Sequence, residues 1–217
     1  MKDIALTLRE EFFPHWLIYA LLATIIVLSA IKSQKEMVFA QMKAAFFKPP
    51  STLPEAKENL SFRNLTNYLM LLNYFVVSGL AIYMVLLYFD RTAYWMVFLP
   101  ASIYFFQLFS LYFVNFISGE YLKVRENIIL LNFITHILGI VIIPLLIIWI
   151  LNPDLSQYMP KCLFYVVILF YIIRLVRGIF MAIHNKVLWF YIILYLCALE
   201  IWPIMVGYLV LSPNFIR

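Results

Sequence analysis

The sequence contains few charged residues, and this scarcity excludes more than any other feature. Only 12% of the 217 residues are charged, whereas 65% are hydrophobic. Soluble domains carry about 25% charged residues, and the surface of a small domain could not accommodate so many apolar side chains in water. The composition therefore excludes an ordinary soluble domain and indicates a protein that lies in a lipid bilayer.

Catalytic, metal and cofactor motifs are also missing from the sequence. We find no His-Glu-x-x-His zinc motif, no Gly-x-Ser-x-Gly nucleophile turn and no glycine-rich phosphate loop. The two cysteines, Cys162 and Cys197, lack metal-ligand spacing and fall at different predicted depths, so we expect small buried side chains rather than a disulfide. No cofactor and no metal is predicted. An enzyme would need a site assembled from separate helices, for which Ser110, Ser118 and Tyr195 are weak candidates.

The net charge of +5 does not predict a nucleic-acid-binding protein. The basic residues lie between apolar runs and form neither a stripe nor a recognition module. Such a distribution is typical of membrane orientation and of contact with anionic lipid headgroups. We therefore expect membrane lipids as partners and no nucleic acid.

Six apolar runs are long enough to cross a bilayer, which takes about 20 predominantly apolar residues per helix. They cover residues 16–31, 65–89, 92–118, 127–151, 161–183 and 187–211. The connections after the second and fifth runs are short, so the helices they join are expected to be antiparallel neighbours. The fold class predicted is all-α: a polytopic transmembrane bundle of six helices forming one membrane domain over residues 1–217.

The distribution of lysine and arginine predicts the orientation. Five basic residues fall on the face that carries the N-terminus: Lys2, Arg9, Arg91, Lys161 and Arg217. Nine fall on the other face: Lys32, Lys35, Lys43, Lys48, Lys57, Arg63, Lys123, Arg125 and Lys186. The positive-inside rule makes the richer face cytoplasmic. We therefore predict a bacterial inner-membrane protein with both termini in the periplasm.

The longest segment outside the predicted spans covers residues 32–64. Its first half places apolar side chains on one helical face beside basic ones, and the pattern predicts an amphipathic helix on the cytoplasmic leaflet. The surface it would offer comprises Lys35, Phe39, Met42, Lys43 and Phe46. The prolines from Pro49 onward end this helix. The segment is either a rigid elbow packed on the bundle or a docking surface for lipid or a protein partner.

Ionisable and polar residues inside the predicted spans form the candidate site. A charge at the bilayer centre costs at least about 2.5–3.5 kcal/mol on insertion scales, so such residues pair or have a function. The depths of the runs allow Arg174 in the fifth helix to pair with Glu200 in the sixth. The whole predicted cluster is Arg174, Arg177, Glu200, His136, Gln107 and Asn132. It is either hydrogen-bonded glue between helices or a site for a polar headgroup, a substrate or protons.

Prolines and tryptophans mark depth along the spans. Pro100, Pro144 and Pro203 interrupt the third, fourth and sixth runs and predict kinks, which either open an outward-facing cavity or serve ordinary packing. Trp16, Trp95 and Trp149 fall at predicted outer ends, and Trp189 falls near an inner end. This placement is typical of the aromatic belts at membrane interfaces.

Three short stretches resemble a known family. The sequence YLCALEIWP at residues 195–203 is the most specific of them, and AAFF at residues 44–47 and GIVIIP at residues 139–144 agree with it. Together they resemble an uncharacterised multi-pass inner-membrane family of Bacteroidota-type bacteria that is known as a domain of unknown function. The resemblance implies a helical bundle in a Gram-negative inner membrane, draws attention to Glu200 and Pro203, and implies no activity.

Three functions remain open on the sequence. The first is a non-enzymatic accessory or assembly subunit of a cell-envelope complex with protein partners in the inner membrane. The small size, the missing catalytic motifs and the basic amphipathic segment favour it. The second is a small transporter or a lipid- or anion-binding protein that uses the buried Arg, Glu and His cluster. The third is an intramembrane enzyme.

Overall fold

The structure, a computed structural model, describes residues 13–34, 65–118 and 121–184. Its regular elements over these ranges are all helical: α1 (Trp16–Gln34), α4 (Leu65–Tyr88), η2 (Tyr94–Phe98), α5 (Leu99–Ser118), α6 (Tyr121–Leu151), η3 (Pro153–Leu155) and α7 (Met159–His184). Five stretches in these helices are long and apolar enough to cross a membrane. For the described residues, the prediction of an all-helical chain with several helices able to span a membrane is thus confirmed. The sixth predicted span (187–211) and the predicted interfacial surface from Lys35 to Phe46 lie outside the described residues.

Several helix ends differ from the sequence prediction. The helix α6 begins at Tyr121 rather than Asn127, because its polar first turns continue the helix beyond the apolar stretch. With 31 residues and a rise of about 1.5 Å per residue, it is roughly 46 Å long. The hydrocarbon core is about 30 Å thick. The beginning of α6 therefore extends past the hydrocarbon core.

The third predicted span is divided into two elements. The 3₁₀ helix η2 covers Tyr94–Phe98, and α5 follows directly from Leu99. Pro100 lies in the first turn of α5. The N–H groups of a first turn have no acceptor within their helix, so the missing N–H of proline costs α5 no hydrogen bond. The turn before η2 contains Asp90 with a φ of 52°, a left-handed conformation that Asp tolerates better than most residues. This tight turn returns the chain after α4.

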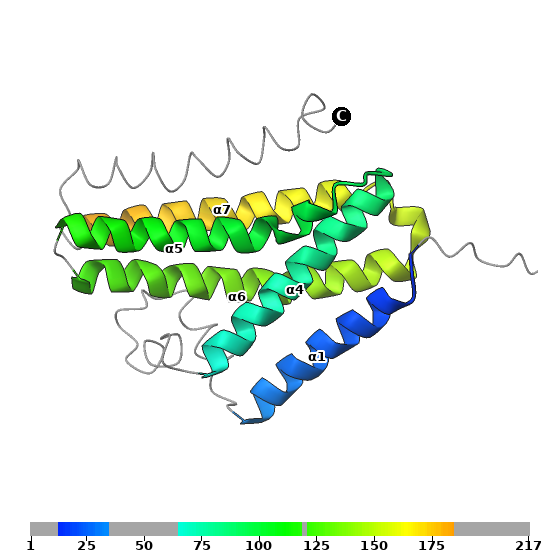
Figure 1. Ribbon diagram of the computed structural model, residues 1–217, viewed down its shortest axis with the longest axis horizontal. Coiled ribbons are helices and arrows are strands. Elements are labelled where there is room, and N and C mark those ends of the chain that lie inside the picture. Colours follow the sequence, from blue (N-terminus) through cyan, green and yellow to red (C-terminus); the bar gives the residue numbers. More distant parts are fainter. Residues whose placement is uncertain (1–12, 35–64, 119–120, 185–217) are drawn as a thin grey trace, which may run out of the picture.

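Two helices occupy the centre of the described bundle. Of the residues in the apolar stretch of α4, 56% are buried, and the share is 44% for α6 but only 22% for α1 and α7. Figure 1 shows α5, α6 and α7 running side by side while α4 crosses them obliquely, with α1 along its far side. The contacts agree, since α4 packs against α1, α5 and α6, and α6 packs against α5 and α7.

A glycine sits at the contact of the two central helices. A Cβ atom added to Gly139 in α6 would lie 3.1 Å from the Cα atom of Tyr74 in α4. That distance is shorter than a normal carbon–carbon contact. Only a residue without a side chain therefore allows α4 and α6 to approach this closely, and Gly139 determines their separation.

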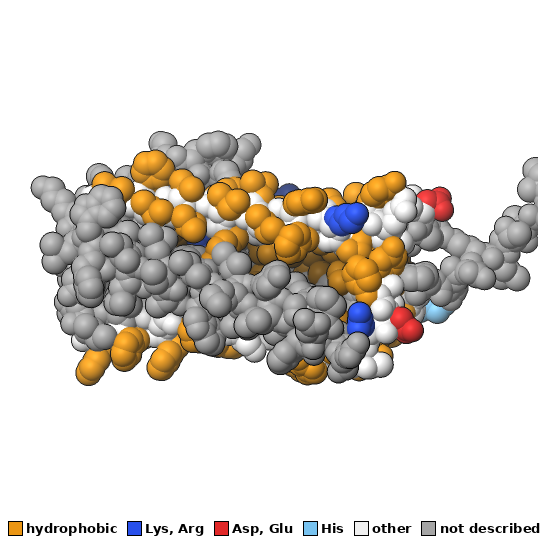
Figure 2. All heavy atoms as spheres, turned by 90° about the horizontal axis from the view of Figure 1, so that it is seen from above, with side chains coloured by type: hydrophobic (Ala, Val, Ile, Leu, Met, Phe, Trp, Pro, Cys, Tyr) orange, Lys and Arg blue, Asp and Glu red, His pale blue; other side chains and the backbone are white. Residues whose placement is uncertain are grey.

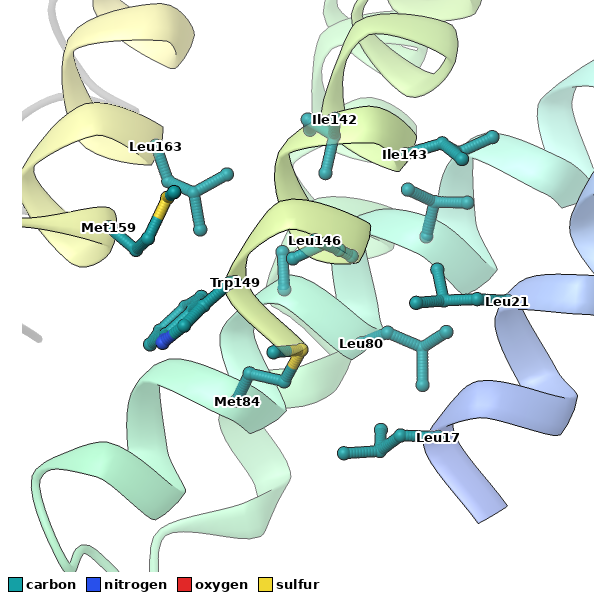
Figure 3. Packing of buried hydrophobic residues seen from close by; sticks show 12 residues of the cluster. Leu17, Leu21, Leu80, Met84, Ile142, Ile143, Leu146, Trp149, Met159 and Leu163 are labelled. Atoms are coloured by element: carbon teal, nitrogen blue, oxygen red, sulfur yellow. The ribbon is translucent and has the colours of Figure 1, made fainter. Parts of the chain in front are cut away.

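The largest apolar core fills the half of the bundle where α4 and α6 end, and we call it the apolar half (Figure 3). Its buried members come from four helices: Leu17, Leu21, Val77, Leu80, Ala81, Met84, Ile142, Ile143, Leu146, Trp149, Met159 and Leu163. The indole of Trp149 is fully buried, and its Nε1 donates to Ser156 Oγ at 3.2 Å. Trp149 lies in the last turn of α6, but its ring faces the interior, where Phe13 and Tyr88 pack against it. Trp16 and Trp95 are exposed.

The outer surface of the described helices is apolar. Figure 2 shows hydrophobic side chains over most of the coloured surface, with the acidic side chains of this face at one end. Large exposed residues recur along α1, α5 and α7, including Tyr19, Phe116 and Tyr165. In water such a surface would be unstable, whereas lipid chains cover it without cost. Cys162, expected to be buried, is partly exposed on this surface.

Candidate functional site

Buried polar side chains gather near the middle of the bundle and toward the end where α4 and α6 begin. They come from α4, α5, α6 and α7, and none is more than 6% exposed. We call them the polar layer: Asn67, Asn73, Tyr104, Gln107, Asn132, His136 and Arg174. The layer contains four of the six residues that the sequence analysis proposed, Gln107, Asn132, His136 and Arg174.

The guanidinium of Arg174 is held by an amide on a different helix. Its Nη1 donates a hydrogen bond of 2.5 Å to Oε1 of Gln107. The two residues are far apart in the chain, on α7 and α5. A hydrogen bond to a charged group contributes about 1.5–3 kcal/mol. This bond therefore connects α5 to α7 inside the bundle.

A second bond connects α5 to α6. The phenol of Tyr104 donates to Oδ1 of Asn132 at 2.6 Å. Tyr104 and Gln107 are three residues apart and so lie on the same face of α5. One face of this helix thus bonds to two different helices. The sequence analysis did not identify Tyr104, although its spacing from Gln107 was a usable signal.

Arg177 lies one turn after Arg174 but is only partly buried. Its guanidinium carbon lies 5.8 Å from the ring centroid of Phe133 in α6. A cation within about 6 Å of an aromatic face is attracted to it. The two arginines therefore contact different partners. Glu200, the predicted partner of Arg174, and Pro203 lie outside the described residues.

His136 and Asn67 carry buried polar atoms whose hydrogen bonds are not made among the described residues. Both amide atoms of Asn67 are in this position, and so is one ring nitrogen of His136, since the ring faces the Asn67 backbone as a hydrogen-bonding group. The backbone of Asn67 lies beside the His136 ring, so the two residues are neighbours across α4 and α6. Leaving a buried polar group unsatisfied costs about 1–3 kcal/mol. These atoms mark a place where the bundle needs an additional hydrogen-bonding partner.

The remaining candidates have structural positions. Pro144 lies inside α6 on its exposed side. The hydroxyl of Ser110 donates to the carbonyl of Phe106 at 2.9 Å, a bond within α5. Such a bond serves the helix rather than a reaction. In the described ranges, no group of three or more His, Cys, Asp or Glu residues is arranged to hold a metal ion.

The comparisons with known proteins give a family and no activity. A family model described as "Domain of unknown function (DUF4271)" matches residues 17–211. The match confirms the resemblance to an uncharacterised family that the short sequence stretches indicated. No curated protein and no solved structure matches the chain.

Proposed function

Since the chain belongs to the DUF4271 family, a family of unknown function, we propose a role for it from its own geometry. It acts as a non-enzymatic accessory or assembly subunit of a larger membrane complex in the cell envelope. It lies in the bacterial inner membrane with both termini in the periplasm, as the basic residues favour. Its partners there are membrane proteins that present an apolar transmembrane helix.

The observation that carries this proposal is an exposed row of side chains from the end of η2 along α5. Its members recur at alternating spacings of four and three residues: Phe98, Ser102, Phe105, Phe109, Tyr112 and Phe116. We call this row the aromatic seam. A spacing of four and three residues is the pattern by which one helix packs along another. The seam is long enough to receive a partner helix over several turns.

The other face of α5 shows why the seam is available. Its inward positions, Tyr104, Gln107 and Leu111, are buried in the bundle. The hydrogen bonds of Tyr104 and Gln107 fix the rotation of α5 about its axis. Because that rotation is fixed, the seam is held toward the outside as a rigid surface. A preorganised surface loses less entropy when a partner packs against it.

The interior supports an assembly role rather than catalysis. The polar residues of α5, α6 and α7 bond to one another across helices. Interhelical bonds of this kind hold a bundle in one register. A subunit that must present a fixed outer surface benefits from such rigidity. The buried polar residues thus stabilise the bundle, and the outer surface determines which protein it binds.

Site-specific photo-crosslinking in intact cells tests the proposal. A benzophenone amino acid replaces Phe109, whose side chain is 69% exposed in the middle of the seam. We expect one discrete crosslinked product whose second component is an integral membrane protein, identified by mass spectrometry. The matched control replaces Tyr165 in α7, which is 67% exposed but lies outside the seam. The control is expected to crosslink to lipid alone.

A second experiment decides whether the seam itself binds. The double substitution Phe109→Ala and Phe116→Ala removes two exposed rings of the seam that belong to none of the core clusters. We expect the partner found by crosslinking to be lost from the purified complex while the bundle remains folded. If both crosslinker positions capture lipid only, and the native protein purifies as a lone monomer, the accessory role is wrong.

The buried arginine favours a second candidate function, a small transporter or a lipid- or anion-binding protein. Arg174 is almost entirely buried, and Arg177 lies one turn away. Guanidinium groups suit phosphate and carboxylate ligands. This function predicts that Arg174→Met leaves a folded protein that no longer retains anionic lipid during purification. Equal retention of phosphatidylglycerol by the variant and the wild type would argue against it.

A further inference from the structure

The orphaned polar atoms of Asn67 and His136 belong to one place in the fold. Asn67 lies in the first turn of α4 and His136 in the middle of α6. Both side chains are buried, and the Asn67 backbone lies beside the His136 ring. With the Asn67 backbone as a hydrogen-bonding group for one ring nitrogen, the other ring nitrogen, one amide nitrogen and one amide oxygen lack hydrogen-bond partners among the described residues. The place thus combines donors and acceptors at the contact of two helices.

We infer that Asn67 and His136 form a buried hydration site, in which a small number of water molecules bridge α4 and α6. An amide offers donors and an acceptor, and an imidazole with one ring proton offers one of each. Water is the ligand that can satisfy both kinds of atom at once. Buried water in proteins typically makes about three hydrogen bonds to polar groups that would otherwise be unsatisfied. The site goes beyond the proposed accessory role and does not depend on it.

The helix geometry places Asn67 and His136 away from the closest contact of α4 and α6. The closest approach of α4 and α6 is at Tyr74 and Gly139, and Figure 1 shows α4 crossing α6 obliquely. Helices that cross separate on either side of the crossing point. Asn67 lies two turns before Tyr74, and His136 lies one turn before Gly139. Both residues therefore lie on the side where the helices separate.

The polar surroundings are consistent with an uncharged ligand. The acidic residues whose side chains the structure describes, Asp90 and Asp154, lie in the turns that follow α4 and α6. The bonds of Arg174 and Tyr104 to Gln107 and Asn132 belong to the neighbouring contacts with α5. Neither bond reaches Asn67 or His136. The site thus needs hydrogen bonds and no countercharge, which water supplies.

Solid-state NMR of the full chain in lipid bilayers tests the inference. The sequence has three histidines, so labelling with ¹⁵N-histidine gives few signals, and a His136→Phe variant assigns the one from His136. We expect magnetisation transfer from water to the ring nitrogens of His136. The substitution Asn67→Leu removes both amide atoms and is expected to reduce this transfer at least several-fold.

A matched control separates the site from general effects on the helix. Asn73 lies on the same helix and is also buried. Six residues place it about 120° around the helix axis from Asn67. Asn73→Leu is therefore expected to leave the water signal of His136 unchanged. An equal loss in both variants would show that the signal reports on α4 as a whole, and the inference would fail.

Two results in the wild-type protein overturn the inference without any variant. One is a direct correlation between the His136 ring nitrogens and the side-chain amide group of Asn67, with no transfer from water. The other is transfer from lipid headgroup or acyl protons instead of water, which would make the place a lipid site. Because both are measured in the wild type, a failure of Asn67→Leu to fold does not leave the inference untested.

Discussion

The two parts of the bundle are held together in different ways. The apolar half consists of branched and aromatic side chains from four helices around the fully buried Trp149. The polar layer lies among apolar side chains as well, but it also has side-chain hydrogen bonds that join α5 to α6 and to α7. Apolar contacts have little directional preference, whereas a hydrogen bond needs one geometry. The apolar half therefore contributes packing, and the polar layer determines which way the helices face.

The membrane sharpens this contrast. Lipid chains are as apolar as leucine, so helices gain association energy in the membrane from tight packing and from hydrogen bonds rather than from leaving water. In the apolar half, a substitution thus costs stability mainly through the van der Waals contacts that are lost when a cavity forms. In the polar layer, a substitution costs stability mainly because a buried polar group loses its hydrogen-bond partner. Substitutions in the two parts should therefore destabilise the protein for different reasons.

The largest effect is expected from Trp149→Ala in the apolar half. Removing this ring leaves a cavity between Phe13, Tyr88 and the core, and we expect a loss on the order of 3 kcal/mol in the free energy of unfolding. Unfolding of the reconstituted protein by sodium dodecyl sulfate in mixed micelles measures it. Trp95→Ala is the control, because Trp95 is exposed and should change stability by less than about 0.5 kcal/mol. Equal losses would show that the buried ring contributes no special packing.

In the polar layer, Gln107→Leu is expected to have the next largest effect. The substitution removes the acceptor that Arg174 uses, and we expect a loss of about 2 kcal/mol. A double-mutant cycle with Arg174→Met isolates the pair. If the bond connects α5 to α7, the double variant should lose clearly less than the sum of the single losses. Strictly additive losses would show that the two side chains do not stabilise each other.

The contact between the two central helices can be tested at Gly139. A Cβ atom there would meet the backbone of Tyr74, so Gly139→Ala should push α4 from α6 and destabilise the protein by about 1 kcal/mol. Gly79→Ala is the matched control, because the nearest atom to its Cβ is the side-chain carbon Cγ1 of Val97, also at 3.1 Å. A side chain can rotate away more easily than a backbone, so thermal unfolding in nanodiscs should show a smaller loss. The reverse order would contradict the described contact.

The smallest effect is expected from Tyr104→Phe. The change keeps the ring and its packing against Phe75 but removes the hydroxyl that bonds to Asn132. Interhelical hydrogen bonds in membranes contribute about 0.6 kcal/mol on average, and we expect a loss near that average. Tyr112→Phe changes the same atom at an exposed position and should be neutral. If the unfolding curves of the two variants coincide, the hydroxyl of Tyr104 does not stabilise the bundle.

The sequence predicted which residues belong to the candidate site better than it predicted which of them contact each other. Arg174, Gln107, Asn132 and His136 could be identified because polar residues inside apolar runs are rare. Their partners could not, since a pairing depends on the rotation of each helix. Tyr104 escaped identification because tyrosine is equally common at lipid-facing and buried positions of such a protein. The burial of Trp149 was missed for the same reason, since depth in the membrane does not say whether a side chain points outward or inward.

The sequence by itself determined that this protein is helical and lies in a membrane. A long apolar run must form a helix in hydrocarbon, because no water is present there to bond its backbone groups. The tertiary structure alone decided which helices touch and which face each one buries. An apolar side chain is equally stable against lipid and against another helix. The composition of a helix therefore says little about which of its faces points into the bundle. The close approach at Gly139 and the bonds of Tyr104 and Gln107 supply that information, because contact distances and hydrogen-bond geometry exist only once the helices have packed.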